Sequence, residues 1–123
     1  MRTTYAVLLC VLLVLVSACT PKVNDPADVQ AIKKSVDDYV KAVNAGDAGA
    51  VAALMTDKTV YSIPNAADLV GAEAIRPLFQ AIFSQFKCEF SALVADVRVT
   101  GDVAVARGTW TQKLTPNDQR QLH

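Results

Sequence analysis

Apolar residues recur every three or four positions after Pro26, which is the spacing of one face of a helix. Asp25 can cap the free N–H groups at the start of this stretch, and Gly46 can supply a left-handed conformation at its end. Asp47 then caps a second, shorter helix. The pattern therefore predicts two consecutive helices that meet at Gly46, the first with the stripe Val29, Ile32, Val36, Val40 and Val43.

A third apolar stripe predicts a helix after Gly71. Pro77 lies inside this stripe and has no backbone N–H to donate, so either the regular helix begins near Arg76 or its first turns are kinked. The stripe consists of Ile75, Leu78, Phe79, Ile82, Phe83 and Phe86.

β-Branched and aromatic residues at 59–63 predict a short strand that Pro64 stops, with a loop over 65–71. After residue 88, apolar positions alternate and then change parity, which suggests a β-bulge near Ala95 and Asp96. Gly101 and Asp102 form a two-residue hairpin turn. The returning strand covers 103–114, and the tail 115–123 is polar and has no pattern. The mature chain is therefore predicted to be an α+β protein with a helix, helix, strand, helix, strand, strand order.

The N-terminus has the three-part form of a secretory signal: a short positive start, an apolar run over 5–16, and small residues before Cys19. The run is shorter than the roughly 20 residues that cross a bilayer. An uncleaved anchor or a buried core helix is the alternative, but a core helix would need a polar face that this run lacks.

The segment Val16-Ser17-Ala18-Cys19 resembles the bacterial lipobox. That resemblance implies lipidation of Cys19 and cleavage before it, with 1–18 as the signal peptide and 19–25 as a polar tether between the lipid and the domain. We therefore expect a lipid-anchored protein of the bacterial cell envelope whose partner is the membrane. Thr20, where an inner-membrane lipoprotein would have Asp, favours the outer membrane, facing the periplasm.

Of the three cysteines, Cys10 leaves with the signal peptide and Cys19 carries lipid, so Cys88 remains alone. We interpret Cys88 as a buried apolar residue, because no His or Lys-rich neighbourhood would make it reactive. The chain has 12 basic and 12 acidic residues, and the loss of Arg2 leaves the mature chain at 11 against 12, or −1. With no basic cluster, nucleic acid is excluded as a partner.

The "NAGD" join at 44–47 and the "GAEAIR" segment at 71–76 are similar to features of SnoaL-like and ketosteroid isomerase-like domains. These belong to the nuclear transport factor 2-like superfamily, and the resemblance extends from about Val29 to Leu114. It implies a cone-like domain over 26–114, in which a curved antiparallel sheet wraps around three helices. It also implies a mainly apolar pocket, for which the candidate lining residues are Tyr39, Met55, Ile63, Phe83 and Trp110.

Two departures from that family count against catalysis. Ile63 stands where ketosteroid isomerase has its general-base aspartate, and isoleucine cannot move a proton. Only Tyr39 matches an oxyanion tyrosine; it could donate to a bound carbonyl, but packing beside the buried stripe explains it as well. The family usually adds one or two strands after residue 114; we therefore expect either that the sequence is truncated or that a partner supplies the missing pairing.

No residue is assigned a catalytic role, and no cofactor motif or metal-ligand cluster is apparent; His123 is the only histidine. The leading hypothesis is a lipid-anchored module that binds a small apolar molecule or serves as an envelope accessory protein. One alternative is an isomerase, cyclase or dehydratase in which Tyr39 polarises a carbonyl and Asp57 is the nearest base. Another is a structural module that forms a homodimer, with Trp110 in its core or interface.

Overall fold

The computed structural model describes residues 20–118 and confirms the α+β class. The proposed signal peptide, Cys19 and His123 lie outside these residues. Within them, no helix is long and apolar enough to cross a membrane. The elements in chain order are α2 (Pro26–Ala45), α3 (Ala48–Ala53), β1 (Val60–Tyr61), β2 (Leu69–Val70), α4 (Ala72–Gln85), β3 (Phe86–Thr100) and β4 (Val103–Pro116).

The caps of α2 and α3 confirm the predicted ends of these helices. Asp25 accepts a hydrogen bond from the Ala27 N–H (2.9 Å), and Asp47 accepts one from the Ala50 N–H (2.9 Å). Gly46 has φ 67°, and its N–H donates to Val43 O (3.1 Å). Left-handed glycine thus reverses the chain tightly enough to pack α3 beside the end of α2.

The segment predicted as one strand and a loop is a small hairpin instead. β1 is only two residues long, and it pairs with β2, where Val60 faces Val70 and Tyr61 faces Leu69. The prediction of a loop over 65–71 is therefore wrong at its end. Two consecutive apolar residues at the end of a short loop carry too little periodicity to predict a strand.

Helix α4 begins at Ala72 and contains Pro77, so of the two alternatives the start near Arg76 is wrong. The carbonyl of Gly71 accepts hydrogen bonds from Ala74 and Ile75 (both 3.1 Å), which starts the helix before Pro77 is reached. Pro77 removes one hydrogen bond from the second turn. The burial of Ile75 and Phe79 (0% and 4% exposed) stabilises the helix around it.

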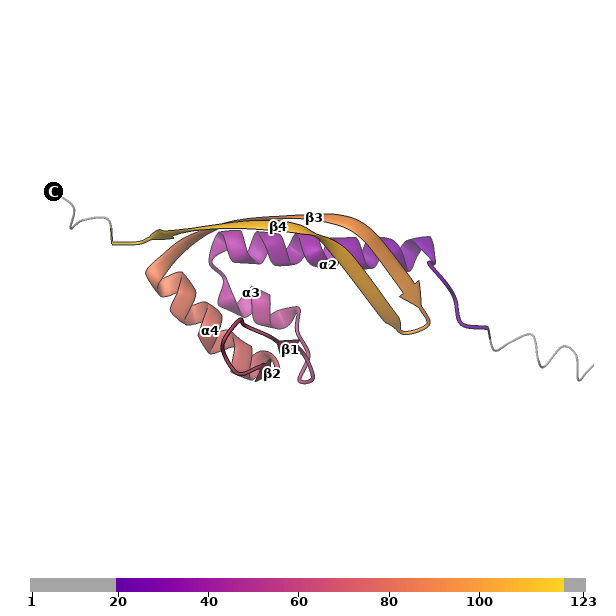
Figure 1. Ribbon diagram of the computed structural model, residues 1–123, viewed down its shortest axis with the longest axis horizontal. Helices are drawn as coiled ribbons and strands as arrows, with labels where there is room; N and C mark the ends of the chain where they lie inside the picture. The colour runs from indigo at the N-terminus through magenta and orange to yellow at the C-terminus, as the bar shows by residue number, and fades with distance from the viewer. Residues whose placement is uncertain (1–19, 119–123) are drawn as a thin grey trace, which may run out of the picture.

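Strands β3 and β4 form a long antiparallel hairpin that arches over α2 (Figure 1). The pairing shifts register between Val94 and Asp96, which confirms the predicted bulge. Gly108 lies opposite Val94, and a Cβ there would stand 2.1 Å from Leu93 O. Only glycine allows the two backbones to approach this closely, so the bulge depends on Gly108.

The outer edge of β3, opposite β4, is occupied at two places by side chains and backbone from outside the hairpin. Near the turn, Val23 forms an isolated bridge with Thr100, and the Lys22 carbonyl accepts from the Gly101 N–H (3.0 Å). Asn24 accepts from the Val99 N–H (2.9 Å) through its side chain. The segment predicted as a free tether is thus attached to the sheet from Lys22 onward.

The core lies where the end of α2, α3, α4 and β3 meet. It is made of small and medium apolar side chains, and Cys88 is among them as a free, buried cysteine (4% exposed), as predicted. At the end of the hairpin remote from its turn, β4 runs two residues beyond the predicted end, to Pro116. Asn117 then donates to the carbonyls of Phe83 and Ser84 (3.2 and 3.1 Å), closing the end of α4. The buried core residues are Ala42, Val43, Ala48, Val51, Ile75, Phe79 and Cys88.

Candidate ligand-binding site

An apolar cavity of about 340 Å³ opens between α2, α4 and the hairpin. This volume is at the lower end of the roughly 300–1,000 Å³ of small-molecule pockets. Its wall includes residues of α2, β1, α4, β3 and β4, so the turn at Gly46 and the arch of the hairpin both shape it. The lining residues are Tyr39, Val43, Tyr61, Ser62, Phe79, Ile82, Phe83, Phe90, Trp110, Gln112 and Leu114.

Aromatic rings in contact run from the surface to the core along this cavity. Trp110 on β4 stacks on Phe90 of β3, with ring centroids 6.0 Å apart. Phe90 meets Tyr39 edge-on at 5.7 Å, and Tyr39 meets Phe79 edge-on at 6.3 Å. Trp110 is 66% exposed, whereas Phe79 is 4% exposed, so the row leads from the mouth to the floor of the cavity. Such a wall suits a flat or ring-shaped apolar molecule.

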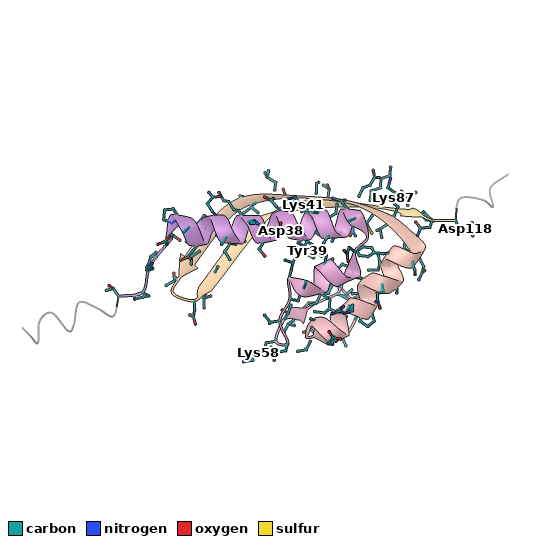
Figure 2. The ribbon with its side chains drawn as sticks, turned by 180° about the vertical axis from the view of Figure 1, so that it is seen from behind. Asp38, Tyr39, Lys41, Lys58, Lys87 and Asp118 are labelled. Atoms are coloured by element: carbon teal, nitrogen blue, oxygen red, sulfur yellow. The ribbon has the colours of Figure 1, made fainter. Side chains whose placement is uncertain are left out.

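Tyr39 brings a polar group into this apolar surrounding. It projects from α2 between the helices (Figure 2), where its ring packs against Phe79. Burial, followed by the nearby Tyr61 hydroxyl and Cys88 thiol, raises the pKa of Tyr39 well above its usual value. The hydroxyl therefore keeps its proton at any physiological pH. It can donate a hydrogen bond to a ligand, but it cannot act as a base.

Cys88 lies at the back of the same region. Burial raises the pKa of its thiol, while the side chain of Gln112 acts in the opposite direction. A thiol that retains its proton is a poor nucleophile. Gln112, which lines the cavity, adds an amide that can both donate and accept hydrogen bonds.

Within residues 20–118, no carboxylate, lysine, arginine or histidine lines this cavity. Asp38, next in sequence to Tyr39, pairs with Lys34 and lies 4.0 Å from Lys41, so its charge is already matched on the outside of α2. The hydrogen bond from Lys34 holds the pKa of Asp38 below its usual value. Asp57, the alternative base, does not line the cavity. The site thus has hydrogen-bond donors but no acid and base pair.

Three of the five residues expected at the pocket, Tyr39, Phe83 and Trp110, line the cavity. Met55 and Ile63 do not line the cavity. Met55 packs against the core, and the cavity lining includes Tyr61 and Ser62 but not the next residue, Ile63. Phe90 and Gln112 were missed. The alternation after residue 88 could have indicated Phe90, but Gln112 reaches the cavity only because the hairpin register pairs it with Phe90.

Asn44 positions the Phe90 wall. Its side-chain amide donates to Phe90 O (2.8 Å), and its carbonyl oxygen accepts from the Phe90 N–H (2.7 Å). The asparagine therefore occupies the edge of β3 as a neighbouring strand would. It fixes the end of α2 to the strand at the residue that stacks on Trp110.

Comparisons with known proteins agree with this architecture. A family profile described as the SnoaL-like domain matches residues 36–122. No curated protein sequence matches the chain significantly.

Solved structures resemble the chain at low sequence identity. A ketosteroid isomerase-like protein from Erwinia carotovora atroseptica has a TM-score of 0.60 and 23% identity, over 72% of this chain and 75% of that chain. A candidate dehydratase of the nuclear transport factor 2-like family from Streptomyces avermitilis has a TM-score of 0.54 and 20% identity, over 74% and 78%.

A third structure, an LEH-like epoxide hydrolase from Mycobacterium tuberculosis, has a TM-score of 0.51 and 16% identity. The match covers 66% of this chain and 59% of that one. At these sequence identities the likeness shows a shared fold only. One fold can support unrelated activities, so the likeness does not assign an activity to this chain.

Proposed function

This chain belongs to the SnoaL-like domain family, and on that premise we propose that it binds a small, neutral, largely apolar molecule in the aromatic cavity without catalysing its conversion. The observation that carries the proposal is the composition of the cavity wall. Aromatic and aliphatic side chains surround Tyr39 and Gln112, which can hydrogen-bond a ligand oxygen.

The expected ligand has one polar oxygen on a compact apolar skeleton. Tyr39 is a permanent donor, so a carbonyl or hydroxyl oxygen suits it. A carboxylate would enter an apolar cavity that has no cationic partner, at a large desolvation cost. A ketone or alcohol should therefore bind more tightly than the carboxylate with the same carbon skeleton.

Thermal denaturation with a panel of cyclic ketones, alcohols and matching carboxylates tests this proposal. A ligand that binds only the folded state raises the melting temperature. Leu114→Arg, at a cavity residue that is 45% exposed, should abolish the rise. Leu93→Arg, on the same hairpin and 71% exposed but outside the cavity, should leave it unchanged. A panel without any shift would count strongly against a ligand-binding role.

An isomerase, cyclase or dehydratase activity is the second candidate, since Tyr39 could polarise a carbonyl. It needs a base, and Asp57 would have to reach the substrate from outside the cavity wall. If a converted substrate is found, Tyr39→Phe and Asp57→Asn decide the assignment. Undiminished turnover in both variants would remove these residues from the mechanism.

We further propose that the domain is held at a bacterial membrane by lipid on Cys19, most consistently at the periplasmic side of the outer membrane. The lipobox-like segment at 16–19 supports this. The test is the intact mass of protein taken from its native membrane. A chain that begins at Cys19 and carries diacylglyceryl and acyl groups is expected, whereas an unlipidated chain that retains 1–18 would refute the anchor.

A further inference from the structure

The start of the described chain and the β3–β4 turn lie at the same end of the molecule (Figure 1). Gly101 in the turn donates its N–H to the Lys22 carbonyl (3.0 Å), and a Cβ on Gly101 would stand 3.8 Å from the Pro21 side chain. Residues 20 and 21 are therefore all that separates Cys19 from the turn. At about 3.5 Å per extended residue, the chain from Cys19 to Lys22 can span at most roughly 10 Å.

Three exposed valines gather on the outer face of the hairpin beside this turn. Val23 pairs with Thr100, and Thr100 pairs with Val103. The side chains of Val23 and Val103 therefore lie on the same face of the sheet, on either side of Thr100. Val105 stands two residues further along the same face of β4. Val23, Val103 and Val105 are 64%, 62% and 57% exposed, and we refer to them as the tip patch.

We infer that the tip patch rests on the lipid bilayer that the Cys19 acyl chains enter. The inference depends on the proposed anchor, because the acyl chains supply the affinity and the patch only sets the orientation. The short connection to Cys19 favours the bilayer as the occupant: a lipid joined to the chain three residues before Lys22 keeps the tip patch close to the membrane interface.

The charges around the tip patch are compatible with shallow contact. Lys22 lies 3.6 Å from Asp25, and Arg98 bonds Asp96 at 3.1 Å, so both cations stand beside carboxylates. Asp102 is in the turn itself. The patch should therefore lie among the headgroups without entering the hydrocarbon.

This orientation holds the cavity away from the bilayer. Trp110 is on the opposite face of the hairpin from Val103, and it lies seven residues, or roughly 23 Å, further along β4. The mouth of the cavity beside Trp110 and Leu114 would then open above the headgroups. A ligand would arrive from the aqueous side and not by lateral diffusion in the lipid.

Depth-dependent fluorescence quenching tests the inference on the lipidated full-length protein. The protein is reconstituted into vesicles of phosphatidylethanolamine and phosphatidylglycerol that contain lipids brominated near the headgroup. An environment-sensitive thiol label is placed at Val103→Cys in one preparation and at Leu93→Cys in another. Leu93 is the matched control because it is exposed on the outer face of the same hairpin but remote from the turn. Cys88 is buried and stays in place.

The inference requires quenching of the Val103→Cys label at least roughly twofold stronger than that of Leu93→Cys, as expected for a side chain at the interface. Equal, weak quenching in protein whose mass shows the lipid would overturn the orientation and leave the anchor intact. Weak quenching, together with cross-linking of unlabelled Val103→Cys chains by a bifunctional thiol reagent, would assign the patch to a second copy instead. Protein without lipid that does not bind vesicles would overturn both proposals.

Discussion

The side chain of Asn44 and the backbone of Phe90 form two reciprocal hydrogen bonds, of 2.8 and 2.7 Å, across 46 positions in the sequence. The pair ties the end of α2 to β3 where the strand contributes an aromatic ring to the cavity. A single polar residue thus links the packing of a helix to the shape of the candidate site.

Asn44→Ala should lower the free energy of unfolding by about 1–2 kcal/mol, because two hydrogen bonds of ordinary strength are lost. It should also weaken ligand binding, since the Phe90 wall loses its support. Urea denaturation and ligand titration measure the two effects. Asn24→Gly is the control: it removes the bond to Val99 but keeps the positive φ of 51° accessible. That variant should lose stability while retaining ligand affinity, and a parallel loss of affinity would contradict the local role of Asn44.

Gly108→Ala should be among the most damaging small substitutions, with a loss of about 2–4 kcal/mol, because the new Cβ would overlap Leu93 O. The strands must separate at the bulge to accommodate it. Urea midpoints compare it with Gly49→Ala in α3, where the nearest atom is the mobile Asp47 carboxylate at 3.3 Å. The control should stay within about 1 kcal/mol of wild type. Equal midpoints would show that the hairpin can relax at Gly108.

Tyr39 predicts a specific loss of stability in alkaline solution. Its pKa is raised in the folded state, so below about pH 10 both states hold the proton and stability does not depend on this group. Above that pH the unfolded chain releases the proton and the folded chain retains it. Stability should then fall by up to about 1.4 kcal/mol per pH unit. Tyr39→Phe should flatten this slope in urea denaturation, and an unchanged slope would show that Tyr39 ionises freely.

Trp110 should report ligand binding, because its ring stands at the cavity mouth and is 66% exposed. A bound apolar molecule would cover the ring and shift its fluorescence to shorter wavelength. The control moves the fluorophore along the strand: Trp110→Phe combined with Val105→Trp places it outside the cavity wall. That protein should show no shift with the same ligand. Shifts of equal size in both proteins would indicate non-specific binding to the sheet.

The helix boundaries could be predicted because local chemistry sets them. Asp25, Gly46 and Asp47 determine the ends of α2 and α3 through bonds to neighbouring residues. The bulge in β3 could be predicted for a related reason, since a change in alternation must appear wherever one face stays buried.

The candidate site was only partly predictable, because its polar contacts join distant parts of the chain. Nothing near Asn44 in the sequence indicates that its amide meets Phe90, and Gln112 reaches the cavity only through the register of the hairpin. Ile63 was placed at the pocket by the family resemblance, on a strand expected to continue to Pro64. The strand ends at Tyr61, so Ile63 no longer follows the cavity wall.

The two edges of the long hairpin differ in a way that limits how copies can associate. Asn44 at Phe90, and the segment from Lys22 to Asn24 near the turn, already take up hydrogen-bonding positions along the outer edge of β3. Within residues 20–118, the outer edge of β4 has no such cover. A sheet with one open edge can be extended only once: two copies joined along β4 would form a closed, twofold pair with no edge left for a third. Asn44, which supports the cavity wall, and Asn24 near the turn would thereby guard the protein against open-ended polymerisation.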